Sequence, residues 1–522
     1  MIRKHQNVSV VSRKSKYIIA GVAVGLCAGF VVSAFRWLIT KWIDVVLEVN
    51  HFLTQHWHQP WWLLLWMLVS LILAIILGLI VKSEPHIKGS GIPQVELQLQ
   101  GKLSMNWWRI LWKKFVGGAL AIGSGLILGR EGPSIQLGAA VGQGVASTLK
   151  SNKVQENVLI SAGAGAGLAA AFNAPIAGLM FVLEEVHHNF SRNVVLTTLT
   201  AGLVSNFVSL QFFGLTPSLN LGNYEVFPVH LYWVIVILGV VLGLLGWLYQ
   251  QGIFALPKIY STLFPKVPKH FYSVIGFLIM IPIGLYSQDL LFGGGELVFD
   301  LVEKQPAMIF LFGLFICRFI LAMMSYGTGL PGGIFLPILS LGAIIGSLFG
   351  EMAVSVLHVP EAYYSSFVIY AMAGYFAAIG KAPLTSLLLV TEMVGGLNQL
   401  MPLGICVLSA YLTAEFLKMA PIYEVLAEKM SHDEDDEHTG RRTVFEVPVP
   451  VESKLVGRMV KEIAWPKDII IATIRRGEKE FVTKGDLRIQ AGDLLIVVTD
   501  EGHLAKMQDA VNHLAMMEVE LQ

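Results

Sequence analysis

The chain has 522 residues, of which 54% are hydrophobic and 14% are charged, and its mean hydropathy is +0.64. Soluble domains carry about 25% charged residues, so this composition excludes an ordinary soluble protein and indicates a polytopic membrane protein. Lysine plus arginine and aspartate plus glutamate number 37 each, so no net charge favours nucleic acid as a partner.

Residues 1–16 are basic and precede an apolar run that is too long for the core of a signal peptide. We expect them to form a cytoplasmic arm, followed by a membrane domain over 17–420. Apolar runs able to cross about 30 Å of hydrocarbon begin near Tyr17, Trp61, Phe115, Val194, Tyr232, Phe271, Met308 and Leu403. All three cysteines lie inside apolar runs, where we expect buried thiols and no disulfide.

Glycine-rich breaks interrupt the apolar sequence at three places: GSGIPQ from Gly89, GREGPS from Gly129 and GTGLPGGIFLP from Gly327. In each, glycines allow the chain to bend and a proline suits the first turn of a following helix. The first amides of a helix have no partner within it, and the helix dipole leaves about half a positive charge there. Three converging helix starts would bind chloride or nitrate without a full positive charge, weakly enough for release.

The second break carries Arg130 and Glu131 within an otherwise uncharged stretch. A carboxylate is itself an anion, so Glu131 at a helix start can occupy the place of chloride and leave it when protonated. Chloride and proton would then be linked at one residue. The alternative is that Glu131 only caps a helix or pairs with Arg130. Intramembrane ionisable groups are costly and usually functional, which favours the linked role.

Two parts of the sequence resemble each other. GREG followed by LGAAVG (129–142) parallels GLPG followed by LGAIIG (329–346), and APIAGLMFVLE (174–184) parallels APLTSLLLVTE (382–392). Corresponding broken segments indicate a transporter built from repeats, with its binding site at the breaks. Similar composition of small-residue helices is the alternative, and the shared order of two motifs disfavours it.

An acidic pair, Glu184 and Glu185, ends the first of these apolar segments. It either marks the membrane interface or includes a group that passes protons from the cytoplasm towards Glu131, and the sequence leaves both open. A metalloenzyme is a rival, because Glu184 with His187 and Glu185 with His188 have the spacing of bridged metal ligands. We expect no metal or cofactor, since Glu392 of the second segment lacks a following histidine.

Beyond Met419 the composition changes. A charged linker is expected over 421–443 and a small α+β domain over 444–522. Its β-type runs are VFEVPVPV, DIIIATIRR, EFVTK and DLLIVVT, and GHLAKMQDAVNHLAMM is typical of a closing helix.

The four motifs GSGIPQ, GREGP, AFNAPIAGLMFVLEE and GLPGGIFLP resemble, in this order, the signatures of CLC chloride channels and chloride/proton antiporters. The resemblance implies a polytopic all-α homodimer with inverted repeats, a pore in each subunit, and a non-enzymatic chloride/proton antiporter. The alternative is a passive chloride channel on the same scaffold.

The resemblance also implies roles for individual residues. Chloride would be bound by the Ser90 hydroxyl and the amides of Ile334 and Phe335, with an outer site at the amides of Arg130 to Gly132. Serine at position 90 is the family's choice for chloride over nitrate. Glu131 would be the external gating glutamate and Glu185 the internal proton-transfer glutamate. Counting from TEM (391–393) to Pro402 puts Leu397 at the position of a chloride-coordinating tyrosine, so we expect one donor to be missing.

The tail resembles an RCK C-terminal (TrkA-C) domain through its Arg-Gly turn at 476–477 and the AGDLLIVV sequence. This resemblance implies a cytoplasmic dimeric module that binds a small regulatory ligand, with cyclic di-AMP as one candidate. A tail that only stabilises the dimer, without a ligand, is the alternative. Both termini would be cytoplasmic.

Overall fold

The computed structural model describes residues 2–187, 191–219, 221, 227–431, 442–477, 479–500 and 504–516. The chain divides into two compact units. The first comprises Met1–Val95 and Met105–Val425, and the second comprises Glu96–Ser104 and Leu426–Gln522. Membrane helices make up the first unit, and the short internal segment Glu96–Ser104 is the only part of the membrane sequence assigned to the second.

Among its described residues, the first unit contains helices and no strand, as its composition predicts. Its helices are α1 (Ile2–Gln55), α2 (Pro60–Ser83), α3 (Ile92–Leu99), α4 (Trp107–Gly123), α5 (Glu131–Thr148), α6 (Lys153–Phe172), α7 (Pro175–Phe181), α8 (Arg192–Phe213), α9 (Tyr232–Leu263), α10 (Tyr272–Tyr286), α11 (Gly295–Lys304), α12 (Met308–Gly327), α13 (Phe335–Leu357), α14 (Tyr364–Gly380), α15 (Pro383–Val394), α16 (Leu400–Phe416) and α17 (Ile422–Ser431). Among the described residues, nine helices are long and apolar enough to cross a membrane. The protein is therefore a multi-pass membrane protein.

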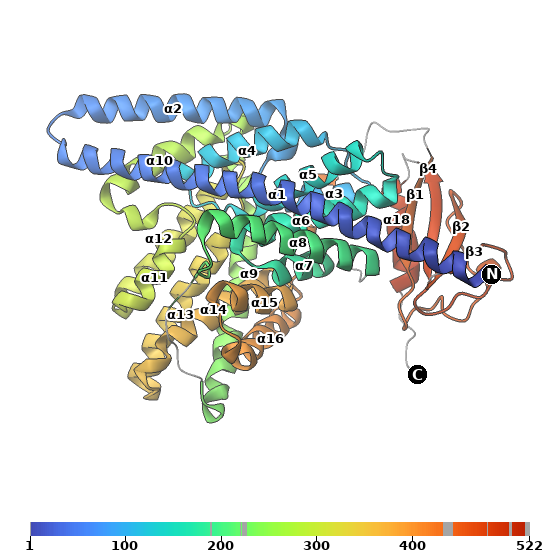
Figure 1. Cartoon of the computed structure of the whole chain (residues 1–522). Helices are drawn as coiled ribbons and strands as arrows, with labels where there is room; N and C mark the ends of the chain where they lie inside the picture. The colour runs from blue at the N-terminus through green and yellow to red at the C-terminus, as the bar shows by residue number, and fades with distance from the viewer. Residues whose placement is uncertain are drawn as a thin grey trace. The chain divides into compact units, whose positions relative to one another are not determined.

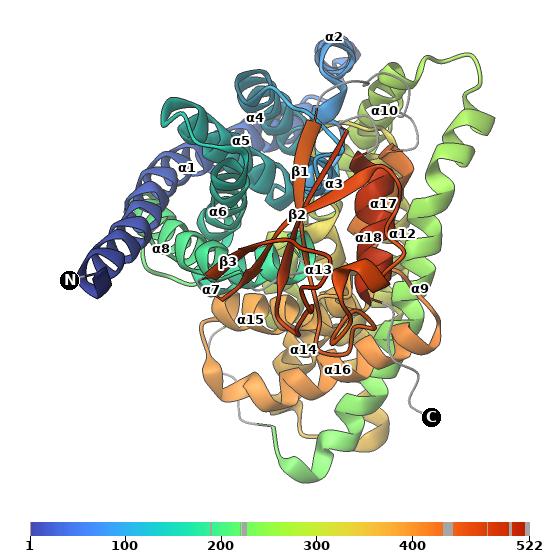
Figure 2. The ribbon, with the colours of Figure 1, turned by 90° about the vertical axis from the view of Figure 1, so that its right-hand side faces the viewer.

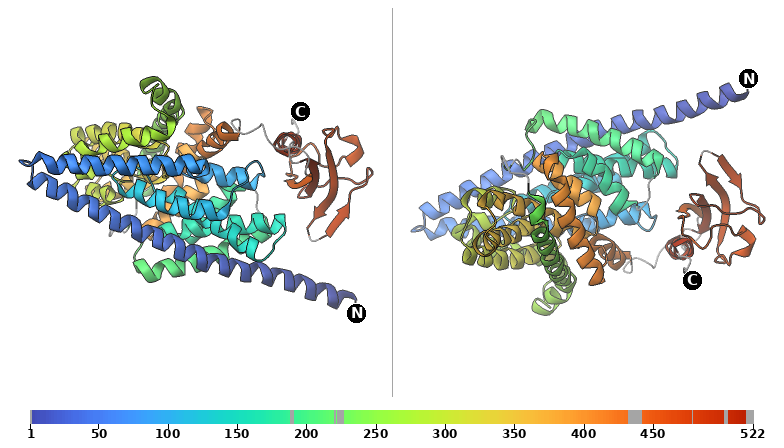
Figure 3. Two further views of the ribbon diagram at one scale, coloured as in Figure 1. Left: turned by 90° about the horizontal axis from the view of Figure 1, so that it is seen from above. Right: turned by 90° about the horizontal axis from the view of Figure 1, so that it is seen from below.

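The N-terminal residues are helical and continuous with the first apolar span. Helix α1 runs without interruption from Ile2 through residues 16 and 17 to Gln55, and α2 turns back after a short connection at its end (Figure 1, Figure 3). The run that begins near Phe115 does not become a long spanning helix, because α4 ends at Gly123 and the chain then turns into the second glycine break.

The two repeats are built alike. In the first, α5 packs closely on α6 where Gly142 lies against the backbone of Leu159, and a Cβ at Gly142 would come within 2.1 Å of the Leu159 carbonyl. In the second, α13 packs on α14 in the same way, and a Cβ at Gly346 would come within 2.5 Å of the Phe367 carbonyl. The matching LGAAVG and LGAIIG motifs therefore supply equivalent close helix contacts. Figure 2 shows α5 and α6 lying together.

Two long helices follow the third glycine break in the second repeat. Helices α13 and α14 are continuous over 23 and 17 residues. Most residues of both helices are buried. Their glycines serve helix packing and do not interrupt the helices.

The second unit contains a four-stranded antiparallel sheet in the order β1-β4-β2-β3. Its elements are β1 (Arg442–Pro448), β2 (Ile469–Arg476), β3 (Lys479–Val482), β4 (Leu494–Asp500) and α18 (Leu504–Met516). The core is apolar, with Ile474, Leu495, Val497 and Val511 fully buried. All four predicted strands and the closing helix are present. The expected linker is partly helical, because α17 extends to Ser431.

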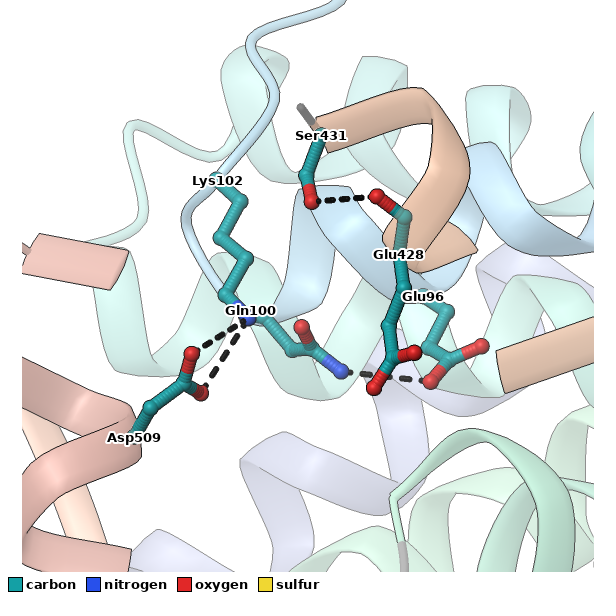
Figure 4. A network of polar contacts seen from close by, with 6 residues as sticks. All are labelled: Glu96, Gln100, Lys102, Glu428, Ser431 and Asp509. Atoms are coloured by element: carbon teal, nitrogen blue, oxygen red, sulfur yellow. Dashed lines mark hydrogen bonds and ion pairs between the residues drawn. The ribbon is translucent and has the colours of Figure 1, made fainter. Parts of the chain in front are cut away.

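The segment Glu96–Ser104 packs within this unit. Gly101 has φ +75° and lies against Leu504, and the Lys102 ammonium pairs with Asp509 of α18 at 3.2 Å. Figure 4 shows these contacts together with Gln100, which donates to Glu96 at the end of α3. Helices α3 and α17 therefore each begin in the first unit and end in the second.

Candidate anion and proton site

The three glycine breaks meet in the interior of the membrane unit and are joined by backbone hydrogen bonds. Gly129 and Gly333 exchange two of them, each 2.7 Å long. Gly89 donates its N–H to the Leu330 carbonyl at 3.2 Å and accepts the N–H of Gly332 at 2.9 Å. Segments that are far apart in the sequence thus form one small backbone junction, as the sequence predicted.

Three helices begin at this junction, namely α3, α5 and α13. The proline of each break lies in the first turn, at Pro93, Pro133 and Pro337. The first amides of α5 and α13, such as those of Gly132 and Leu336, have no carbonyl acceptor within their helices, because this bonding begins only at Ser134 and Ile338. These amides can therefore donate to an anion. The positive ends of the helix dipoles coincide with these amides.

Ser90 lies at the junction and is 1% exposed. Its Oγ accepts the N–H of Ile92 at 3.3 Å, which leaves the hydroxyl proton available for an acceptor other than the backbone. Gly132 packs directly on Ser90, because a Cβ at position 132 would come within 2.7 Å of the Ser90 Cβ. A glycine is therefore required there for the two helix starts to approach each other.

Glu131 is fully buried at the first turn of α5. One carboxylate oxygen lies against Gly129, and the group is within electrostatic range of the amides of Glu131 itself and of Leu336 at the start of α13. Neither oxygen has a hydrogen-bond partner in good geometry among the described residues. The carboxylate thus lies between two helix starts without forming a closed cap.

Arg130 does not neutralise this carboxylate through a direct contact. Its Nε atom is buried without a hydrogen-bond partner among the described residues, although Arg130 and Glu131 attract each other at longer range. The alternative in which Glu131 merely pairs with Arg130 has no bonded contact to support it.

The junction also contains a buried lysine that sequence analysis missed. Lys114 of α4 is completely buried and donates its ammonium to the carbonyls of Ile87 and Gly89, both at 2.8 Å. Lys114 fixes the first break by donating to the Ile87 carbonyl and by adding a second donor to the Gly89 carbonyl, which already accepts the N–H of Gly332. In the sequence, Lys114 stands beside Lys113 in an amphipathic stretch, and nothing there distinguishes it from a surface lysine.

Ile334 and Phe335 form the start of α13, as predicted. Ile334 is the residue before the helix and is 1% exposed, and Phe335 is fully buried. The Phe335 ring packs against Phe376 with a centroid separation of 4.3 Å and against Phe172 at 5.5 Å. These aromatic contacts fix the backbone of Phe335, whose amide is one of the free donors.

The acidic pair is divided between two environments by a π-helical turn over Val182–Val186. Glu184 accepts the amides of Leu384 and Thr385 at the start of α15, so it caps that helix. Glu185 points elsewhere. It is 5% exposed, and its Oε1 lies 3.2 Å from where a Cβ on Gly380 would stand. Of the two acids, only Glu185 is buried at the end of α14 as a proton carrier would need to be.

Leu397 does not lie with the other residues, so its predicted placement is corrected. It belongs to a short 3-10 turn, Leu397–Gln399, and is 73% exposed. Tyr423 at the start of α17 is instead fully buried within electrostatic range of both Glu185 and Glu131. Its hydroxyl has no hydrogen-bond partner among the described residues. An aromatic hydroxyl after a proline, in PIYEVL, was the signal that could have identified it.

The metal alternative has no support in the described part of the chain. His187 is hydrogen-bonded through Nε2 to Ser161 at 2.7 Å, and Ser161 donates its own proton to the Asn157 carbonyl. His188 lies outside the described residues. No group of three or more potential metal ligands occurs among the described residues.

Comparisons with known proteins agree with this geometry. Residues 72–415 match the family described as voltage gated chloride channel, and residues 444–512 match the TrkA-C domain. The H(+)/Cl(-) exchange transporter ClcA of Vibrio parahaemolyticus is 32% identical over 435 residues, which cover 81% of this chain and 91% of that protein. The ClcA of Klebsiella pneumoniae is 31% identical over 431 residues, covering 80% and 89%.

Among solved structures, the chain is similar to a slow cyanobacterial Cl-/H+ antiporter. The TM-score is 0.75 at 30% identity, covering 80% of this chain and 99% of the antiporter. A eukaryotic CLC transporter at 21% identity and a TM-score of 0.66 shares the fold. The chain therefore belongs to the voltage-gated chloride channel (CLC) family and carries a TrkA-C domain at its C-terminal end.

Proposed function

We propose that this protein exchanges chloride for protons across the membrane. The observation that carries the proposal is the position of the Glu131 carboxylate, which is buried between the starts of α5 and α13 beside amides that have no helical partner. An ionised carboxylate there competes with chloride for the same donors. Protonation removes the charge, the side chain leaves, and chloride takes its place. The similarity to H(+)/Cl(-) exchange transporters supports the same activity.

Chloride binding in the centre of the protein would use one side-chain donor from each of two helix starts. The Ser90 hydroxyl retains its proton for an anion, and the Tyr423 hydroxyl is buried without another partner among the described residues. The amides of Ile334 and Phe335 would complete this site. The amides of Arg130 to Gly132 would form an outer site, occupied in turn by chloride and by Glu131.

Glu185 would carry protons on the inner side. It is buried, it lies within electrostatic range of Tyr423, and Tyr423 in turn lies within range of Glu131. A proton delivered to Glu185 would therefore need to cross the region of the central anion site to reach Glu131. This arrangement makes chloride occupancy and proton transfer depend on each other.

Proton transport driven by chloride in proteoliposomes tests this proposal. Under an outward chloride gradient, we expect protons to move uphill into vesicles that contain the protein. Vesicles without the protein are the control and should show no such movement. Chloride flux without any proton movement would contradict exchange and would identify a passive channel, the activity named in the family's own description.

We further propose a homodimer with both termini cytoplasmic and a second unit that regulates transport through a small ligand, with cyclic di-AMP as a candidate. Helix α3 begins just after Ser90, and α17 begins next to Tyr423, the two residues proposed to bind chloride through their hydroxyls. Both helices end in the second unit. Helix α3 has only eight residues, about 12 Å in length. The amides of Lys102 and Leu103 fold back onto the Leu97 carbonyl, so the segment gripped by α18 is bonded to α3 itself.

A further inference from the structure

The starts of α7 and α15 are each capped by a carboxylate from the other repeat. Glu392 of the second repeat accepts the amides of Ile176 and Ala177 at 3.1 and 2.7 Å. Glu184 of the first repeat accepts the amides of Leu384 and Thr385 at the same two distances. Glu392, near the end of α15, therefore caps the start of α7. Glu184, in the turn that follows α7, caps the start of α15.

We infer that Glu392 is a positioning residue for proton transfer and that it acts through Glu185. The inference rests on the role proposed for Glu185. The chemistry is a charge-assisted cap: an ionised carboxylate accepts two amides that have no other acceptor within α7. Glu392 itself does not need to bind substrate or exchange a proton.

Helix α7 depends on such a cap more than a long helix does. It has only seven residues, it follows a sharp turn in which Asn173 has φ +59°, and its first residue is Pro175. The π-helical turn with Glu185 follows α7 directly. A shift of the start of α7 is therefore transmitted to Glu185 over about 15 Å of continuous helical backbone.

The mirror cap holds the same turn from its other side. Glu184 is the immediate neighbour of Glu185, and it is anchored by two amides and by the Thr385 hydroxyl, which donates to Oε2 at 2.7 Å. The π-helical geometry lets Glu184 reach α15 while Glu185 faces Gly380. The position of Glu185 is thus fixed in two ways. The Glu392 cap acts through α7, and the Glu184 cap acts through the peptide bond between Glu184 and Glu185.

The test compares proton and chloride flux in the same proteoliposomes for Glu392→Gln, with Glu361→Gln as a matched control on an exposed glutamate in the short turn Glu361–Tyr363. Glutamine keeps the size but cannot accept both amides on charged oxygens. We expect Glu392→Gln to lower proton flux about tenfold while most chloride flux remains, because misplacing a proton carrier by about 1 Å is costly. The control should change neither flux.

A double variant identifies the route of the effect. If Glu392 acts through Glu185, Glu185→Gln with Glu392→Gln should lose no more proton flux than Glu185→Gln alone. Equal loss of proton and chloride flux in Glu392→Gln, no loss at all, or additive losses in the double variant would each overturn the inference. If Glu185→Gln alone leaves proton flux intact, the proposed role of Glu185 fails instead, and the positioning role fails with it.

A milder variant keeps the inference testable if Glu392→Gln does not fold. Thr385→Val removes only the hydroxyl donor of the mirror cap and leaves both amide bonds in place. We expect a smaller loss in the same direction, about twofold to threefold in proton flux per chloride. An unchanged ratio of proton to chloride flux in this variant would contradict a positioning role for the paired caps.

Discussion

Gly129 and Gly333 exchange two backbone hydrogen bonds of 2.7 Å and thereby join the two repeats at the point where α5 and α13 begin. Neither residue contributes a side chain, yet their pairing brings two sets of unpaired helix amides to one place. The Glu131 carboxylate lies at this place. The chemistry proposed for the protein therefore depends on backbone geometry first and on a single acid second.

Removing the acid should separate chloride movement from proton movement. We predict that Glu131→Ala and Glu131→Gln conduct chloride with no proton flux, since neither side chain can alternate between an anion and a neutral group. Chloride transport by the wild type should also rise as pH falls, because protonation releases the carboxylate, and this rise should vanish in both variants. Proton-coupled exchange retained by Glu131→Ala, measured in proteoliposomes, would remove Glu131 from its role.

The contact between Gly132 and Ser90 should tolerate no added atom. A Cβ at position 132 would lie 2.7 Å from both the Cβ and the carbonyl oxygen of Ser90, so Gly132→Ala must displace the first break. We predict at least about a tenfold loss of chloride affinity, measured by calorimetry. Gly313→Ala in α12 is the matched control, because nothing lies within 4 Å of its Cβ position, and wild-type affinity is expected there.

Tyr423 should contribute a hydroxyl donor to the central site, and Leu397 should contribute nothing. We predict that Tyr423→Phe weakens chloride binding about 10-fold to 150-fold, which corresponds to about 1.5 to 3 kcal/mol for one hydrogen bond to a charged group. Leu397→Ala should bind chloride as the wild type does. Reversed results for the two variants would restore the position that sequence counting suggested.

The contact between Gly101 and Leu504 should influence transport through α3. Gly101→Ala places a Cβ 2.5 Å from Leu504 at φ +75°, whereas Gly457→Ala has the same backbone strain at φ +82° but no atom within 4 Å. We predict that only Gly101→Ala changes the chloride transport rate, by about twofold to fivefold. Equal rates for both variants would show that strain, and not contact with α18, determines the effect.

Local patterns predicted much of this protein. Short local motifs were informative, namely the glycine breaks, the first-turn prolines and the matched repeat motifs. They correctly indicated converging helix starts and a buried Glu131. The strands and the helix of the second unit followed from their hydrophobic patterns in the same way. Each of these features is determined by neighbours in the sequence.

Features that depend on distant contacts were missed. The acidic pair left two roles open because Glu184 finds its partners on Leu384 and Thr385, some 200 residues away. Tyr423 and Lys114 were not identified, since each lies on a helix whose own sequence carries no glycine break. Counting along the chain placed Leu397 wrongly because the loop before α16 takes it to the surface.

Bromide binding observed by anomalous diffraction from crystals of Glu131→Gln tests the central claim most directly. We predict one bromide peak within hydrogen-bond distance of the Gly132 and Leu336 amides, at the position that the carboxylate occupies in the wild type, and a second near the hydroxyls of Ser90 and Tyr423. Bromide bound elsewhere, with those amides and hydroxyls directed away from it, would contradict the account.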